Sequence, residues 1–326
     1  MTFFEKLHLI LIQGTCRSGW STGGKTAATS STLPCNSQDK EYTWRCFRIL
    51  MKGNKKMKKR IISVLLTGLI VIAAAGIEPV CAQETEAGNV LTEDDNRPVG
   101  IISAMNNEID LLLKNADIDH IDQIGGMDFN IGELCGRDVV IVKAGVGKVR
   151  AASGAATLLN TYDLSNVIFT GIAGGVGDET KVLDVVVATD LVQHDYGQIT
   201  NDGFEWNSES GGEDGYYPCD QNLVNLAYES AVSVVGEDHV FRGTIATGDQ
   251  FIASEDYVKL LQNDFDAMAC EMEGAAVAAV CTQYQVPFVV IRTMSDKADG
   301  EAHEIYKDFQ DQAADNSCQI VMDMLG

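Results

Sequence analysis

Positive charge is scarce over most of this 326-residue chain, which has 24 Lys or Arg residues against 47 Asp or Glu residues. Residues 1–82 hold twelve of the basic and four of the acidic residues, which leaves 12 basic and 43 acidic residues in 83–326, a net charge of −31. Nucleic acids and anionic membranes bind to basic surfaces. The composition therefore argues against both as partners, and a solvated acidic surface is the simplest interpretation.

Metal-ligating residues are also few. Residues 83–326 contain five cysteines and four histidines, and no CxxC spacing occurs there. Since zinc sites in proteins use such spacings, we expect no metal centre. Cys270 and Cys281 lie in apolar stretches and are expected to be buried thiols rather than a disulfide bridge. The odd number of cysteines leaves at least one free thiol.

One apolar run near the start of the chain has the features of a targeting segment. Residues 58–60 are basic, residues 61–77 are apolar, and small residues at 80–82 precede Gln83. This arrangement is typical of a secretory signal peptide over residues 57–82. It predicts an exported protein that has no membrane association after cleavage. An uncleaved membrane anchor is the alternative, although the run is short for a full span.

The segments on either side of this run have no recognisable structural pattern. Residues 1–56 show neither a clear hydrophobic period nor a motif, and they precede a segment that normally begins a protein. We therefore expect residues 1–56 to be a non-native extension, with translation starting at Met51 or Met57. Residues 83–97 are polar and are expected to form a disordered linker.

From residue 98 onward, short β-rich runs alternate with helical stretches. The runs are rich in Val and Ile without a polar face, which is typical of strands covered by helices on both sides. Residues 98–326 are therefore expected to form a single α/β domain with a central sheet. The expected strands lie in 99–105, 138–144, 166–177, 183–193, 241–253 and 286–296, with a further one ending near 270, and the expected helices lie in 106–116, 148–162, 271–285 and 303–325.

Ligands of open α/β sheets bind at the carboxyl ends of strands, and here those ends are rich in glycines and acids. The glycines do not form a known cofactor loop. In "GVGKVR", Arg150 stands where a dinucleotide fingerprint needs its third glycine, and the spacing does not fit a Walker loop. Close approach of the backbone to a small or flat ligand is the better interpretation.

Four acids near the ends of expected strands are candidates for chemistry. Glu271 and Glu273 lie in "CEMEGAAVAAVC", and Asp296 ends "FVVIRTMSD". Carboxylates next to such apolar stretches need a partner or a function. A helix-capping role is the alternative, and it suits Glu108 better than the other three. Carboxylate pairs of this kind cleave glycosidic bonds by protonating the leaving group and activating water.

Six segments together resemble one enzyme family. "GIISAMNNEIDLL", "KAGVGKVRAA", "TGIAGG", "TGDQFI", "CEMEGAAVAAVC" and "VPFVVIRTMSDKAD" are similar, in this order, to the motifs of 5'-methylthioadenosine/S-adenosylhomocysteine nucleosidases of the purine nucleoside phosphorylase superfamily. The resemblance implies a single α/β domain with a twisted mixed sheet flanked by helices. It also implies a nucleoside substrate, a homodimer whose partner helps to close the site, and no metal or redox cofactor.

The resemblance assigns roles to individual residues. It implies that Glu108 activates water, that Asp296 binds the adenine and helps to protonate N7, and that Arg292 lies near the water and the glutamates. Glu273 would hold the ribose hydroxyls, and Glu271 would be a second acid in the same network. The other substrate-binding positions that it implies are Met272, which packs on the sugar, Phe251, which stacks on the base, Ile252, whose backbone recognises the base edge, Tyr306, an aromatic over the substrate, and Ser295, Ile172, Ala173 and Gly174.

One departure from the family pattern bears on the reaction. The family often has a serine where this chain has Ile172. The serine helps to hold the water, so its absence removes one anchor for that water. Related phosphorylases hold phosphate with an arginine and a serine near this strand end, where this chain has Phe169 and Ile172. Hydrolysis is therefore favoured over phosphorolysis. A nucleosidase for another purine nucleoside, such as futalosine, and an exported nucleoside-binding protein without turnover remain as alternatives.

Overall fold

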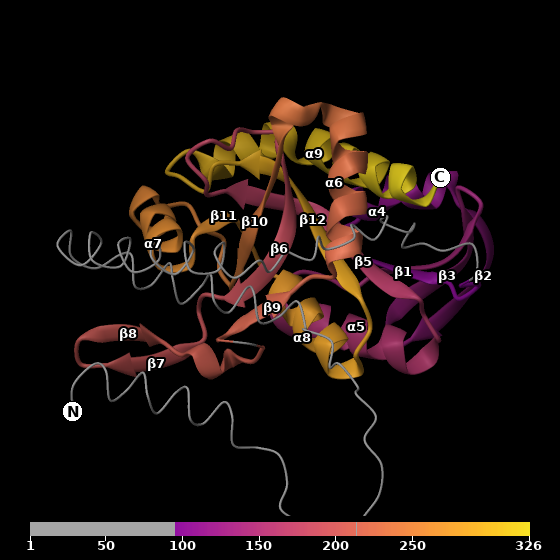
Figure 1. Ribbon diagram of the computed structural model, residues 1–326, viewed down its shortest axis with the longest axis horizontal. Coiled ribbons are helices and arrows are strands. Elements are labelled where there is room, and N and C mark those ends of the chain that lie inside the picture. Colours follow the sequence, from indigo (N-terminus) through magenta and orange to yellow (C-terminus); the bar gives the residue numbers. More distant parts are fainter. Residues whose placement is uncertain (1–94, 213) are drawn as a thin grey trace, which may run out of the picture. The chain divides into compact units, whose positions relative to one another are not determined.

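A ten-stranded mixed sheet forms the centre of the fold (Figure 1). The computed structural model describes residues 95–212 and 214–326, so the predicted start sites, the signal peptide and most of the linker lie outside the described residues. The strands are β1 (Val99–Ser103), β2 (Asp117–Ile124), β3 (Met127–Leu134), β4 (Arg137–Lys143), β5 (Asn166–Gly175), β6 (Val185–Gln193), β9 (Tyr216–Pro218), β10 (Val240–Thr247), β11 (Ala267–Glu271) and β12 (Phe288–Asp296), and a separate hairpin is formed by β7 (Gly197–Thr200) and β8 (Gly203–Trp206).

Helices cover both faces of this sheet. In Figure 1, α4 (Asn107–Asn115), α6 (Gln221–Val235) and α9 (Ala302–Leu325) lie together on one side, and α5 (Lys148–Thr161) and α8 (Gly274–Tyr284) lie on the other. Because both faces are covered, every residue of β1 and β12 is buried. The predicted α/β fold with a mixed sheet flanked by helices is confirmed.

The sheet closes on itself around β11. The sheet order runs β11-β10-β6-β12-β5-β1-β4-β3-β2, and β11 also pairs antiparallel with the end of β5. In that second pairing, Cys270 lies opposite Gly174 and Ala269 opposite Gly175. Strands β5, β12, β6, β10 and β11 therefore form a ring, which brings the ends of β5 and β11 next to each other.

Several elements differ from the sequence-based expectation. The helix expected from residue 271 begins at Gly274, because Glu271 still belongs to β11. Helices α6 and α7 (Glu255–Phe265) and the β2–β3 and β7–β8 hairpins were not anticipated. Strand β2 is an edge strand whose polar residues are mostly exposed, so it lacks the continuous apolar run of the central strands.

The cysteines of the described residues are free thiols. Cys219, Cys270, Cys281 and Cys318 are buried, and Cys135 is exposed. The expectation that Cys270 and Cys281 are buried thiols is confirmed. Across residues 95–212 and 214–326, no helix combines the length and the apolar character that a membrane span requires.

Candidate active site

Six strands and two helices converge on one cavity of about 460 Å³. Its walls come from the segments that follow β1, β4 and β10, from the ends of β5, β11 and β12, and from α4 and α9. All predicted site residues except Arg292 line it. The lining residues are Ala104, Met105, Glu108, Val146, Ile172, Ala173, Gly174, Gln250, Phe251, Ile252, Cys270, Glu271, Met272, Glu273, Ser295, Asp296, His303 and Tyr306.

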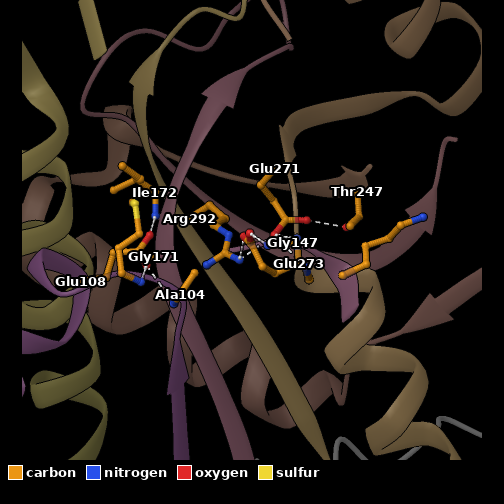
Figure 2. A network of polar contacts seen from close by, with 12 residues as sticks. Ala104, Glu108, Gly147, Gly171, Ile172, Thr247, Glu271, Glu273 and Arg292 are labelled. Carbon is orange, nitrogen blue, oxygen red and sulfur yellow. Dashed lines mark hydrogen bonds and ion pairs between the residues drawn. The ribbon is translucent and has the colours of Figure 1, made fainter. Parts of the chain in front are cut away.

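Glu108 is held by backbone amides rather than by a cation. It lies in the first turn of α4, and its Oε2 accepts hydrogen bonds from the N–H groups of Ala104 (2.9 Å) and Met105 (2.8 Å). Its Oε1 accepts one from the N–H of Ile172 on β5, at 2.9 Å. These three bonds join the ends of β1 and β5 through one buried carboxylate (Figure 2). Glu108 is therefore not a solvated helix cap.

Arg292 lies behind the cavity wall, beneath the glutamates. It is 1% exposed, its Nη2 contacts Glu271 Oε2 at 2.6 Å, and the same nitrogen is 3.8 Å from Glu273 Oε2. The guanidinium carbon lies 4.1 Å from the ring centroid of Phe169, a cation–π contact. The Nε and Nη1 atoms are buried and have no hydrogen-bond partner among the described residues. The predicted proximity of Arg292 to the glutamates is confirmed, and Figure 2 shows it between them and Glu108.

A glycine lets Arg292 and Glu108 approach the same point of β5. A Cβ atom at Gly171 would lie 2.5 Å from Glu108 Oε1 and 2.6 Å from Arg292 Nη1. Real side chains essentially never make contacts this short, and neither neighbour can move away because both are buried. The glycine therefore leaves space for the ends of both the Glu108 and the Arg292 side chains.

Glu271 is bound on all sides by the protein. Its Oε2 accepts hydrogen bonds from the N–H groups of Glu273 (3.0 Å) and Gly274 (2.7 Å) at the start of α8, besides the Arg292 contact. Its Oε1 accepts one from the hydroxyl of Thr247, which in turn accepts one from the N–H of Ala275 at 2.8 Å. The sequence favoured a ligand role over a capping role for Glu271. The capping role is nevertheless present, because Glu271 satisfies amides at the start of α8.

Glu273 has fewer partners and faces the cavity. Its Oε1 accepts a hydrogen bond from the N–H of Gly147 at 2.8 Å, and its contact to Arg292 is long. Burial and the neighbouring charge of Glu271 raise the pKa of Glu273 well above the ordinary glutamate value, against the opposing effects of Arg292 and the Gly147 N–H. Glu273 therefore holds a proton more readily than an ordinary glutamate does.

Asp296 is the acid at the end of β12. Its Oδ2 accepts a hydrogen bond from the Ser295 hydroxyl and its Oδ1 one from the N–H of Ala298, both at 2.8 Å. Burial raises the pKa of Asp296, and the two hydrogen bonds only partly oppose this. A carboxyl group whose pKa is raised in this way holds its proton to higher pH than an ordinary aspartate, which suits a proton donor.

Aromatic side chains form part of the cavity wall. Phe251 is 48% exposed and contacts Tyr306 edge-to-face, with the ring centroids 5.9 Å apart. His303 packs against Phe251 in the same way at 6.3 Å. His303 and Tyr306 are three positions apart on α9, which places them on the same face of the helix.

Some cavity residues were not named as site residues from the sequence. Val146 and Gln250 lie in glycine-containing segments after strands, where the sequence predicts close approach of the backbone to a ligand. His303 could have been found from its spacing to Tyr306. Among the described residues, no three His, Cys, Asp or Glu side chains form a group that could hold a metal ion.

Residues 98–326 match the phosphorylase superfamily. A 5'-methylthioadenosine/S-adenosylhomocysteine nucleosidase of Shewanella denitrificans is 36% identical over 228 residues, which cover 70% of this chain and 98% of that protein. The chain belongs to this nucleosidase family. The family that the six sequence motifs indicated is thereby confirmed.

Solved structures of this nucleosidase family have the same fold. The enzyme of Neisseria meningitidis, in complex with methylthio-immucillin-A, has a TM-score of 0.64 and 34% identity, and the match covers 70% of this chain and 98% of that one. A futalosine hydrolase of Helicobacter pylori is similar too, with a TM-score of 0.62, 31% identity and coverages of 70% and 97%.

Proposed function

We propose that the protein hydrolyses the N-glycosidic bond of 5'-methylthioadenosine and S-adenosylhomocysteine, which releases adenine and the thioribose sugar. The observation that carries the proposal is the cavity in which Glu108, Glu273 and Asp296 meet. The nucleosidases that the chain resembles over almost their full length support the choice of substrate.

The environment of each acid suits one step of this reaction. Asp296, whose pKa is raised by burial, would donate or relay a proton to N7 of the leaving adenine. Glu108 accepts three backbone N–H bonds and would take a proton from the attacking water. Glu273, with one oxygen bonded to Gly147, would hold the ribose hydroxyls with the other. Met272 and Phe251 would pack on the sugar and the base.

The charges around Arg292 also favour a cationic transition state. Glu108 and Glu271 lie near a single arginine, so acids outnumber bases there even when Glu273 holds a proton. The ribosyl carbon gains positive charge as the glycosidic bond breaks. Fixed negative charge near that carbon stabilises the transition state more than the ground state.

The same charges disfavour a phosphorolytic reaction. Within residues 95–212 and 214–326, the cavity lining contains no Lys or Arg. Arg292 lies behind the wall and is paired with Glu271, and Phe169 and Ile172 cannot donate side-chain hydrogen bonds. A phosphate dianion beside Glu108 would meet repulsion without a compensating cation.

The substrate is tested by measuring release of free base from the purified protein. We expect 5'-methylthioadenosine and S-adenosylhomocysteine to be cleaved in preference to futalosine, with the Asp296→Asn variant as a control of low activity. Faster cleavage of futalosine would show that the protein is a futalosine hydrolase, the second candidate function, which the similarity to such an enzyme supports. Binding of a nucleoside analogue without any base release would indicate a binding protein.

We also propose that the protein is a homodimer. Val146 lines the cavity and is 41% exposed, and Val149, at the start of α5, is 80% exposed. The β7–β8 hairpin, which extends away from the sheet in Figure 1, exposes Ile199 at 81% and Phe204 at 45%. Burial of these four side chains in a dimer would remove them from water, which supports the homodimer that the resemblance implies. Light scattering should give a dimer for the wild type and a monomer for Ile199→Asp, and a monomeric wild type would contradict the proposal.

A further inference from the structure

The N-terminus of α5 is held by residues from other loops. Its N-cap is Gly147, which has no side chain to cap the helix and whose φ of 96° favours glycine. The N–H of Lys148 instead donates to Asp249 Oδ1 at 2.8 Å, and the N–H of Gly147 donates to Glu273 Oε1 at 2.8 Å. Two acids from the segments after β10 and β11 thus satisfy amides that a helix leaves unpaired.

A second set of contacts fixes Asp249 and Lys148 relative to each other. Asp195, just beyond the end of β6, accepts hydrogen bonds from Lys148 Nζ at 2.6 Å and from the N–H of Asp249 at 2.9 Å. The side chains of Lys148 and Asp195 are only 18% and 16% exposed. Burial acts to raise the pKa of Asp195, but the bonds from Lys148 and Asp249 outweigh it and lower that pKa. Asp195 is therefore held as a carboxylate.

Lys148, Asp195 and Asp249 contact one another in a closed set of three interactions. This set lies next to the contact between Gly147 and the cavity residue Glu273. The side chain of Lys148 is fixed by Asp195, the backbone of Lys148 is fixed by Asp249, and Asp195 also fixes Asp249. Gly147 directly precedes Lys148, and its own N–H donates to Glu273 (Figure 2). Asp195 itself does not line the cavity, so an effect of Asp195 on Glu273 would pass through this stretch of backbone.

We propose that Lys148, Asp195 and Asp249 form a latch that directs the Gly147 N–H onto Glu273 and so positions this carboxylate for the ribose. The three are positioning residues, and the inference rests on the proposed role of Glu273. The other charged groups that act on Glu273 are Glu271 on β11, Arg292 on β12 and Glu108 on α4.

Opening the latch should act through Glu273 in a measurable way. The Gly147 N–H stabilises the ionised form of Glu273, so its loss raises the pKa of that carboxyl group further. A protonated Glu273 is a weaker acceptor for ribose hydroxyls. We expect Lys148→Met and Asp195→Asn to raise KM about tenfold near neutral pH, which corresponds to the loss of one charge-assisted hydrogen bond, with a smaller change in kcat.

The test is the pH dependence of KM and kcat for these variants. The fall of KM with rising pH should move to higher pH in Lys148→Met and Asp195→Asn, and Lys148→Arg, which keeps a donor for Asp195, should restore it. In a Glu273→Gln background, Lys148→Met should have no further effect on KM. A purely structural role would lower the melting temperature and leave the pH profile in place.

A matched control lies on α7, where Lys259 Nζ is 3.7 Å from Asp256 Oδ1 in an exposed ion pair. Lys259→Met and Asp256→Asn should change neither KM nor its pH dependence. Folded Lys148→Met and Asp195→Asn variants that also keep the wild-type profile would overturn the latch.

Hydrogen exchange separates failure of the latch from failure of the proposed function. If the wild-type protein releases no base, the proposed function is refuted. The latch is then tested only by the hydrogen-exchange rate of the Gly147 amide. This amide should exchange faster in Lys148→Met than in the wild type or in Lys259→Met. Equal exchange in all three would overturn the latch whatever the activity.

Discussion

At the scale of residues, the three glutamates around Arg292 differ in their partners rather than in their burial. Glu108 accepts three backbone N–H groups, and Glu271 accepts N–H, O–H and guanidinium donors. Glu273 has one short hydrogen bond and a pKa raised by burial. In the proposed mechanism, one residue type thus serves as a base, a structural anchor and a ligand clamp.

The first prediction concerns Glu108 and Asp296, the two carboxyl groups to which the proposed mechanism gives the proton transfers. Asp296→Asn and Glu108→Gln should each lower kcat about 10²-fold or more, because general acid and general base catalysis each contribute about 10²- to 10⁴-fold. Affinity for a substrate analogue should change far less, since Glu273 and the apolar contacts remain. Asp110→Asn, an exposed acid on the same helix as Glu108, is the control. A folded Glu108→Gln variant with wild-type kcat would remove Glu108 from the mechanism.

The second prediction concerns stability and pH. Because folding raises the pKa of Glu273 from about 4.5 to about 8, this group binds more protons in the folded protein than in the unfolded chain between these two pH values. The free energy of unfolding should therefore fall as the pH rises through this range, and Asp296 acts in the same direction. Thermal melts of Glu273→Gln should show a shallower fall than the wild type. Glu133→Gln, at an exposed position of β3, should keep the wild-type slope, and a Glu273→Gln slope equal to it would contradict the assignment.

At the scale of elements, the start of α8 depends on one buried hydroxyl. Thr247, at the end of β10, donates to Glu271 and accepts the N–H of Ala275, so it joins β10, β11 and α8. Thr247→Val keeps the shape but leaves a buried amide and a buried carboxylate oxygen each without a partner. We expect a loss of about 1–3 kcal/mol in the free energy of unfolding, measured by denaturant melts.

The comparison for this change is Thr161→Val, at an exposed position of α5 where the hydroxyl donates to the carbonyl of Thr157 within the same helix. This variant should stay within about 0.5 kcal/mol of the wild type. Equal stability of the two variants would show that the Thr247 contacts do not support α8.

The sequence predicts elements well where tertiary contacts and local pattern agree. The central strands were predictable, because burial on both faces produces continuous runs of Val and Ile, as in β5 and β6. The ring through β11 was not, since the pairing of Cys270 with Gly174 joins residues far apart in the chain. The site residues were predictable from motifs, but the partners of Glu271 and the contacts of Asp195 depend on the folded arrangement of several loops.

At the scale of the whole molecule, the acidic domain and the basic, apolar segment before it suggest export. We predict that the mature protein begins near Gln83, because residues 57–82 have the layout of a signal peptide. Mass spectrometry of the protein from its natural source should then find no peptide from residues 1–56. Lys59→Glu combined with Arg60→Glu should reduce export by removing the basic head. Recovery of a mature form that retains residues 61–77 would support a membrane anchor instead.

The central claim is that the cavity hydrolyses a nucleoside and does not use phosphate. It is tested most directly by measuring adenine release from 5'-methylthioadenosine as phosphate is added to phosphate-free buffer. We predict the full rate without phosphate and the free thioribose sugar as the second product, because the cavity lining offers no cation to a dianion and Glu108 repels it. A rate that rises in proportion to phosphate, with a sugar 1-phosphate as the product, would contradict the account.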